Sequence, residues 1–364
     1  MPVDESFWNP YRMIPVQQKI PRKSPLTDEK FSGHSGHLCC TLTNLTPLFI
    51  GGNKDDPNKK NQTFLTKDIG KFEKNCVIPG TSLKGALRSL AEIVGNGCMI
   101  TDHGKACKKI NALCIACRMF GMMEQGSNAR VHKGKVSISD ALLQEEKPSS
   151  ISLDVYLSSS KLSHEPFYRT PETNRYDQQS RKMYFHQPKR IDSVQKLSPI
   201  VQDNAWKINA LEINHHFEFT VHFSNLTQDE LSLLVYILAL ENNVSVVIES
   251  GNIHLNGPLR HKIGNAKPLG LGSCHIQINE LVLLNPPKQR FSSLTQLQDT
   301  SYTGDALQTK INAYTKPFVS DNRQTMQQLR KMMVWDENDD RVFKYPDYHW
   351  FKNPEYSQKP LKKI

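Results

Sequence analysis

The stretch CVIPGTSLKGALR, which spans residues 76–88, constrains the fold more than any other part of the chain. Its apolar run ends at a Pro79-Gly80 turn, and we expect a helix to begin at Thr81 or Ser82, because either hydroxyl can cap the first backbone amides. Apolar residues of this helix recur at helical spacing, at Leu83, Leu87, Leu90 and Val94. The stretch therefore predicts a strand, a tight turn and an amphipathic helix.

A second face of this helix has the residues of a phosphate-binding site. Lys84 and Arg88 are four residues apart, so they share a face that lies away from the apolar positions. Gly80, Thr81 and Ser82 add a turn, two hydroxyl groups and a helix N-terminus, and helix N-termini attract anions. A surface helix with solvated charges has the same pattern, so both interpretations stay open on this stretch alone.

The rest of the chain repeats the strand–helix–strand pattern. Alternating residues over 213–223 predict a strand, and Thr227 can cap a helix whose apolar residues run from 231 to 240. The other expected strands lie at 37–50, 64–77, 131–142, 244–255 and 274–284. Two strand–helix–strand passages are typical of a ferredoxin-like α+β fold, which is the fold class we predict.

Polar and irregular segments interrupt this pattern and define the expected domain organisation. We expect an extended arm that packs on a neighbouring element or subunit, a ferredoxin-like core with two insertions, and a C-terminal extension with one helix at 321–333 and no core of its own. The boundaries are 1–33 for the arm, 34–285 for the core, 96–118 and 144–209 for the insertions, and 286–364 for the extension.

The charge balance favours a polyanionic partner. The chain has 46 Lys and Arg residues against 36 Asp and Glu residues, a formal net charge of +10, and basic proteins are attracted to nucleic acids. Its longest apolar runs are far too short to span a membrane, and its first residues do not have the form of a signal peptide. We therefore expect a cytoplasmic protein with no membrane partner.

Four of the eight cysteines lie in one short segment and have the spacing of a metal site. Cys114 and Cys117 form a C-x2-C pair, Cys107 lies seven residues earlier, and the fourth ligand is either Cys98 or His103. Such clustering in a cytoplasmic protein indicates a structural zinc ion, although reduced cysteines that cluster by chance have the same pattern. The remaining cysteines are expected to be buried small hydrophobic residues: Cys39, Cys40, Cys76 and Cys274.

The glycine-rich loop at 260–273 also suits an anionic ligand. It contains Lys262, Lys267, Gly270 and Gly272. Glycines let backbone amides approach phosphates closely, and lysines add positive charge. A glycine-rich turn between two strands explains the same composition.

The polar insertion combines cations with aromatic rings. Arg181 and Lys182 stand beside Tyr184, and aromatic rings that alternate with cations suit stacking on exposed RNA bases. A flexible basic loop would have the same composition without binding RNA.

Five stretches, in order, resemble the RAMP superfamily. They are SGHLCCTLTNLTPLFIGG at 35–52, IPGTSLKG at 78–85, LCIACRMFG at 113–121, RKMYFHQP at 181–188 and NAKPLGLGS at 265–273. Members of this family form the RNA-binding backbone of type III CRISPR effector complexes. The resemblance therefore implies a modified RNA-recognition-type fold, and it implies that the partners are guide RNA, target RNA and other subunits of such a complex.

The same resemblance implies roles for several segments. Related subunits carry a zinc-binding insertion just before their C-x2-C-R-x-F-G stretch, which agrees with the cysteine cluster of this chain. The helix at 81–95 and the loop at 260–273 would line the path of the guide RNA. Part of 144–209 would act as a thumb that wedges between guide and target bases.

The sequence leaves open whether this chain cleaves RNA. Cleaving relatives place an Asp on the loop after the first strand, where this chain has Asp55, Asp56 and Asp68 and where Mg²⁺ would assist the cut. Asp55 and Asp56 are the candidates, but Gln62 occupies the position that aligns with the family's Asp. An Asp-Asp-Pro turn is the structural alternative.

Two other functions are compatible with the sequence. The first is a stand-alone endoribonuclease that matures guide precursors, as some relatives do with His or Tyr as general acid and base. Its candidate residues are His34, His37, Tyr184 and His186. The second is a zinc-stabilised nucleic-acid-binding protein outside this family, which the five ordered stretches disfavour.

Overall fold

The computed structural model describes most of the chain. The described residues are 8–15, 19–27, 29–52, 61–68, 74–99, 106–155, 157, 169–170, 175–176, 180–189, 206–286, 299–345, 350, 352–357, 362 and 364. Among them, no helix is long and apolar enough to cross a membrane.

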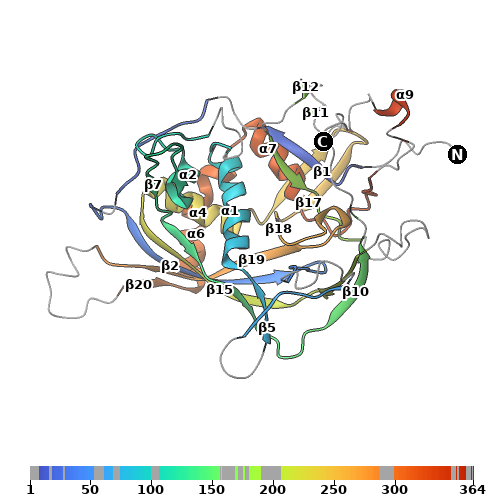
Figure 1. The fold of residues 1–364 in the computed structure, drawn as a ribbon, viewed down its shortest axis with the longest axis horizontal. Helices are drawn as coiled ribbons and strands as arrows, with labels where there is room; N and C mark the ends of the chain where they lie inside the picture. Colours follow the sequence, from blue (N-terminus) through green and yellow to red (C-terminus); the bar gives the residue numbers. More distant parts are fainter. Residues whose placement is uncertain are drawn as a thin grey trace.

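The core of the molecule is an antiparallel sheet built around strand β2 (His34–Asn44) (Figure 1). β2 lies between β15 (His216–Leu226) and β19 (Ser273–Leu283) and pairs with both. Beyond β15 the sheet contains β8 (Val136–Ile138), β9 (Ala141–Leu143), β5 (Lys74–Ile78) and β4 (Thr66–Asp68). The first main strand thus lies between the third and the fourth, so the predicted ferredoxin-like α+β fold class is confirmed.

Two helices cover one face of this sheet. α1 (Gly80–Val94) and α4 (Gln228–Ala239) pack against each other and lie above the sheet in Figure 1. Thr227 caps α4 in a full capping box, as the sequence predicts. Alternate side chains of β2 point towards the helices and are buried, namely Leu38, Cys40 and Leu42. The side chains between them lie on the opposite, open face of the sheet.

The C-terminal region extends the helical layer. α6 (Gly304–Val319) packs on α4, and α7 (Gln324–Met333) packs on α1. β20 (Thr300–Tyr302) pairs with β19. The helix expected at 321–333 is α7, whereas α6 was missed, because only a few of its residues are buried and Pro317 lies inside it.

The N-terminal arm packs within the same molecule. β1 (Tyr11–Pro15) pairs with β13 (Ser180–Tyr184) of the polar insertion. The Trp8 amide donates to the Val342 carbonyl, so a C-terminal segment runs beside the arm. Side chains of the arm, the sheet and the C-terminal region belong to one hydrophobic cluster.

Several expected strands are broken or short. The strand expected at 244–255 is a hairpin of β16 (Val244–Ile248) and β17 (Ile253–Gly257), because residues 249–252 form a turn. The segment 131–142 contains three short strands instead of one. The remaining elements are β3 (Asn61–Gln62), β6 (Met122–Met123), β7 (Val131–His132), β10 (Ser150–Val155), β11 (Arg169–Thr170), β12 (Arg175–Tyr176), β14 (Trp206–Leu211), β18 (His261–Lys262), α2 (Ile115–Phe120), η3 (Lys267–Leu269) and α9 (Pro354–Ser357).

Candidate nucleic-acid interface

A carboxylate occupies the N-terminus of α1, where the sequence predicts a phosphate. No side chain caps the helix, so the predicted capping by Thr81 or Ser82 is wrong. Instead, the Gly80 amide donates a 2.8 Å hydrogen bond to Oδ1 of Asp140. Asp140 also pairs with Lys67, and this contact, followed by the Gly80 amide, lowers the pKa of the carboxyl group.

Lys84 is the cation of α1 that remains available to a ligand. Its side chain is half-buried, and it has no carboxylate partner among the described residues. Burial, and then the nearby Arg88, lower its pKa. The exposed side chains of Thr81 and Ser82 precede it on the same helix. These hydroxyl groups and the ammonium group form the α1 part of the interface.

Arg88 contacts protein groups instead of solvent. Its guanidinium donates to Oε1 of Glu92 at 3.1 Å, to the carbonyl of Gly121 at 2.9 Å and to Sγ of Cys117 at 3.4 Å. The other oxygen of the buried Glu92 pairs with Arg181 of β13. Arg88 therefore joins α1 to the cysteine segment, and Glu92 joins it to β13.

The aromatic and cationic residues of β13 also contact protein. The Lys182 ammonium lies 3.7 Å from the ring centroid of Tyr11 and 5.2 Å from that of Tyr184. The rings of Tyr11 and Tyr184 meet edge to face, with centroids 5.9 Å apart. The N-terminal arm thus contacts the side chains that the sequence predicts to stack on RNA.

The glycine-rich loop holds two half-buried lysines. Lys262 Nζ donates to the Gly270 carbonyl and to Ser273 Oγ, both at 3.2 Å. Burial, and then the proximity of Lys267, lower the pKa of Lys262 to about 7. Burial also lowers the pKa of Lys267. Neither lysine has a carboxylate partner in the described part of the chain.

Backbone geometry explains the last glycine of this loop. Gly272 has φ +79°, a conformation that favours glycine. Its amide donates to the Pro47 carbonyl, and its carbonyl accepts from the Ile263 amide. A Cβ atom at this position would overlap the Ile263 carbonyl. Gly272 therefore fixes the loop against the segment that follows β2.

The residues that follow β13 form hydrogen bonds to the glycine-rich loop. His186 is buried, with one ring nitrogen 2.8 Å from Ser273 Oγ and the other 3.1 Å from the Arg260 carbonyl. Burial, and then Lys262, hold the pKa of His186 well below its usual value. Gln187 Nε2 donates to the Pro268 carbonyl at 2.9 Å. Through these contacts the structure brings together two of the resembling stretches, those at 181–188 and 265–273.

The four clustered cysteines form a buried site at metal-binding distance. The Sγ atoms of Cys98, Cys107, Cys114 and Cys117 all lie within 4.8 Å of one another. The Sγ atoms of Cys98 and Cys117 are 3.5 Å apart, close to the roughly 3.8 Å that tetrahedral Zn–S bonds of about 2.3 Å require. His103, the alternative ligand, lies outside the described residues.

The surroundings of these sulfur atoms suit thiolate ligands. Cys114 Sγ accepts from the amides of Cys98 at 3.3 Å and of Cys117 at 3.4 Å, and Cys107 Sγ accepts from the amide of Cys114 at 3.2 Å. Arg88 adds a positive charge beside Cys117. Such donors stabilise negative charge on metal-bound sulfur, so the residues fit a tetrahedral ion.

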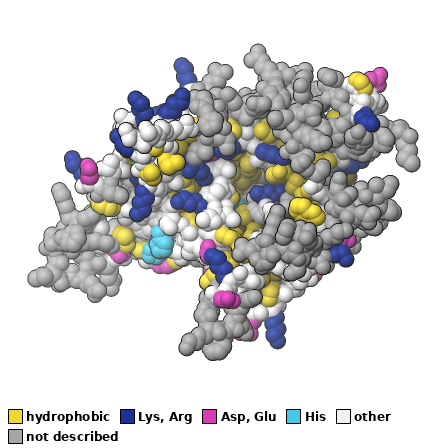
Figure 2. Space-filling model, in the orientation of Figure 1, with side chains coloured by type: hydrophobic (Ala, Val, Ile, Leu, Met, Phe, Trp, Pro, Cys, Tyr) yellow, Lys and Arg dark blue, Asp and Glu magenta, His cyan; other side chains and the backbone are white. Residues whose placement is uncertain are grey.

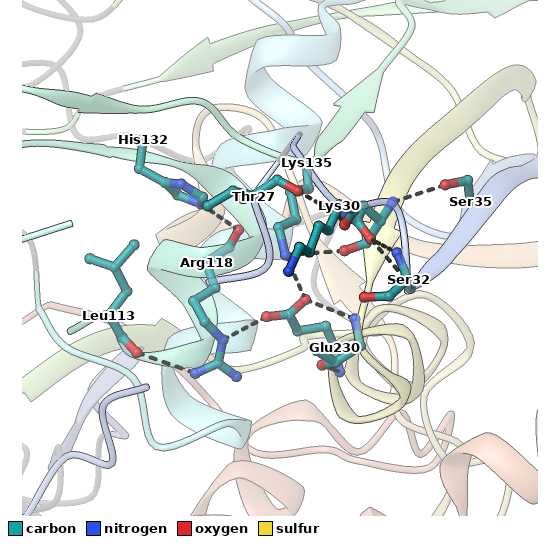
Figure 3. A network of polar contacts seen from close by, with 12 residues as sticks. Thr27, Lys30, Ser32, Ser35, Leu113, Arg118, His132, Lys135 and Glu230 are labelled. Carbon is teal, nitrogen blue, oxygen red and sulfur yellow. Dashed lines mark hydrogen bonds and ion pairs between the residues drawn. The ribbon is translucent and has the colours of Figure 1, made fainter. Parts of the chain in front are cut away.

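A buried ion-pair network, which the sequence did not reveal, supports this region (Figure 3). Glu230 of α4 accepts from Arg118 Nε at 2.6 Å and from Lys135 Nζ at 3.2 Å. Although burial alone would raise the pKa of Glu230, Arg118, the Thr227 amide and Lys135 lower it. Lys135 also donates to the Asn225 carbonyl. The Arg of the C-x2-C-R-x-F-G stretch is therefore a structural residue.

The basic residues of the interface lie on one face of the molecule. In the space-filling view, Lys and Arg side chains gather near the centre, on both sides of the position that α1 takes in Figure 1 (Figure 2). This distribution places positive charge on the face of the molecule on which α1 lies.

The structure does not place the two residues predicted for cleavage. Asp55 and Asp56 lie outside the described residues. Gln62 ends β3, which pairs with β14, and Asp68 is exposed at the end of β4.

Comparisons with known proteins identify the family. No curated protein matches the chain. Csc2 from Thermofilum pendens matches with a TM-score of 0.35 and 11% identity, over 81% of each chain. A chain of a Type IV-B CRISPR complex matches with a TM-score of 0.37 and 13% identity, over 72% of this chain and 93% of the other. The sequence model of the RAMP superfamily matches residues 41–274, which is more than half of the chain, and the protein therefore belongs to the RAMP superfamily.

Proposed function

We propose that this protein is an RNA-binding backbone subunit of a type III CRISPR ribonucleoprotein. It would hold guide RNA by its phosphates and present it to complementary target RNA. The observation that carries this proposal is a set of half-buried lysines that have no carboxylate partner within the described part of the chain, namely Lys84, Lys262 and Lys267. Two buried arginines, by contrast, have carboxylate partners: Arg118 pairs with Glu230, and Arg330 pairs with Glu241.

Half-buried lysines that lack a nearby carboxylate favour a ligand with several negative charges. Burial disfavours the ammonium form unless an anion compensates it. A nucleic-acid backbone supplies phosphates at regular spacing, and α1 and the glycine-rich loop would each supply cations to it. Family membership supports RNA as that ligand and other complex subunits as the protein partners.

The alternative, a stand-alone endoribonuclease, has less support from the site. One of its candidate groups, His186, is buried and uses both ring nitrogens in protein contacts. Another, Tyr184, packs on Tyr11. A general acid or base must reach the reacting oxygen, and neither group is free to do so.

We also propose that the four-cysteine site holds a structural zinc ion. Cys98, Cys107, Cys114 and Cys117 would be its ligands, and the ion would join the insertion at 96–118 to α1 through Arg88. A site with four protein ligands has no open position for catalysis. Its role would be to stabilise the fold.

Binding of single-stranded RNA tests the main proposal. Lys84→Ala combined with Lys267→Ala should weaken binding of all RNA sequences alike and reduce the salt dependence by roughly one unit per lost phosphate contact. Lys316→Ala, which removes an exposed lysine of α6, is the matched control. Unchanged affinity and salt dependence in the double variant would contradict the proposal.

A second measurement separates the two functions. Native mass spectrometry of the protein purified from its host should find it bound to RNA and to other subunits. If it is instead recovered alone, and cuts guide precursor RNA without added metal, the endoribonuclease is correct.

A further inference from the structure

The open face of the sheet carries metal-ligating side chains that RNA binding does not use. His37 and Cys39 are two residues apart in β2, so both point away from the helices. His222 of β15 lies opposite His37, and Glu280 of β19 lies opposite Cys39. Four side chains that can bind a metal thus meet at the centre of three neighbouring strands.

A β-bulge turns Glu280 towards this face. Pairing of β19 with β2 is regular up to Ile278 and resumes with Glu280 opposite Cys39, so Asn279 is an extra residue. Without it, alternation would place Glu280 opposite Leu38, on the face that the helices cover. Bulges are known to redirect side chains at functional sites. Here the bulge brings a carboxylate beside a thiol.

The distances suit one ion. The potential ligand atoms of His37, Cys39 and Glu280 all lie within 4.8 Å of one another. Tetrahedral zinc places its ligand atoms roughly 3.5 Å apart, so small side-chain rotations are sufficient. The ring centroids of His37 and His222 are 5.7 Å apart, which puts a second imidazole beside the group.

An outer contact orients the carboxylate. Ser301 Oγ of β20 donates a 2.6 Å hydrogen bond to Oε1 of Glu280. The Cys39 thiol also hydrogen-bonds to the Glu280 carboxylate. Hydrogen bonds of this kind fix the orientation of metal-binding carboxylates.

We propose that His37, Cys39 and Glu280 form a second metal site, which binds Zn²⁺. A thiolate, an imidazole and a carboxylate are the donors of zinc, whereas Mg²⁺ and Ca²⁺ prefer oxygen ligands alone. His222 or a water molecule takes the fourth position. All three ligand side chains are partly exposed, so this ion is exchangeable, unlike an ion enclosed by the four buried cysteines.

Cobalt binding by the full-length protein tests this site, because Co²⁺ replaces Zn²⁺ and shows an absorption band when a thiolate binds it. Wild type and Cys39→Ala are titrated with Co²⁺ after zinc loading. The wild type should show a thiolate band that Cys39→Ala lacks, and should bind one more ion per chain. Any band that persists in Cys39→Ala belongs to the four-cysteine site, so the difference isolates the new one.

Matched variants complete the test. Glu280→Gln and His37→Gln should weaken the additional ion at least tenfold. Cys76→Ala and His216→Ala, which change a half-buried thiol and an exposed imidazole elsewhere on the sheet, should leave it unchanged. Circular dichroism verifies that each variant is folded. Equal cobalt stoichiometry and equal spectra for wild type and Cys39→Ala would overturn the proposal.

Discussion

Under the proposed function, Lys262 would link RNA binding to its own protonation state. Its pKa is lowered to about 7 by burial and then by Lys267, so the ammonium form is only partly populated near neutral pH. A bound phosphate favours that form and therefore raises the pKa again. RNA binding at this loop should take up a proton.

The resulting prediction concerns pH. RNA affinity should fall as the pH rises above about 7, by at most about tenfold per pH unit, because only the charged lysine binds phosphate. Lys262→Arg should remove this dependence, since its guanidinium stays charged. Fluorescence anisotropy at several pH values measures both. An equally steep pH profile in the two proteins would show that Lys262 is not the titrating group.

The lowered pKa of Lys262 also affects the stability of the protein without RNA, which should increase as the pH rises, whereas RNA affinity should decrease. The folded state binds fewer protons at Lys262 than the unfolded state does, since the folded pKa is the lower one. This group therefore lowers stability below pH 7, and its unfavourable contribution disappears as the pH rises from about 7 towards the ordinary lysine value.

Individual residues also mark the limit of what the sequence can predict. Lys84 and Arg88 are equivalent by spacing, and both were predicted to bind phosphate. The structure gives Arg88 three protein acceptors and leaves Lys84 with no carboxylate partner among the described residues. The difference comes from Gly121 and Cys117, which only tertiary folding brings to the helix. Spacing along one helix cannot reveal such partners.

At the scale of elements, Arg88 and Glu92 join α1 to its neighbours. Arg88→Ala removes three hydrogen bonds and leaves the buried Glu92 with Arg181 alone. We expect the free energy of unfolding to fall by about 2–3 kcal/mol, as measured by chemical denaturation. Lys84→Ala, one turn earlier, should change it by less than about 0.5 kcal/mol. Equal effects of the two variants would mean that the Arg88 contacts contribute nothing.

Glu230 joins α4 to its neighbours through ion pairs with Arg118 and Lys135. Glu230→Gln leaves Arg118 and Lys135 without their carboxylate and should lower stability by about 3–5 kcal/mol at neutral pH. The folded pKa of Glu230 is lowered, so its contribution is present above the unfolded pKa and is lost as the pH falls through the folded value. Thermal unfolding should therefore show a difference between variant and wild type that shrinks in acid. A constant difference would exclude this ion-pair explanation.

Sequence periodicity predicted the elements that carry strong apolar patterns and missed those that do not. α1, α4, β2, β15 and β19 lie close to where alternation or helical spacing placed them. α6 was missed, because its few buried residues leave a weak pattern. The pairing of β1 in the arm with β13 could not be predicted either, because the sequence of a strand does not indicate which other strand it pairs with. The cysteine cluster was predictable because the C-x2-C spacing is itself typical of zinc ligands.

At the scale of the whole molecule, the four cysteines belong to the same hydrophobic cluster as the sheet and both helices. Loss of their ion should therefore destabilise the entire protein. Cys114→Ser combined with Cys117→Ser should lose one zinc per chain by elemental analysis and lower the melting temperature in one transition. Cys76→Ser is the matched control. Full zinc retention in the double variant would contradict the assignment.

The Asp140 carboxylate occupies the position at the N-terminus of α1 where a phosphate could bind. Its carboxylate accepts a hydrogen bond from the Gly80 amide at the start of α1. Without such a partner, this amide could bind an anion from solution. The helix end is therefore already neutralised before nucleic acid arrives and is left unchanged when it departs. The proposed RNA would therefore dock beside an anion that belongs to the protein itself.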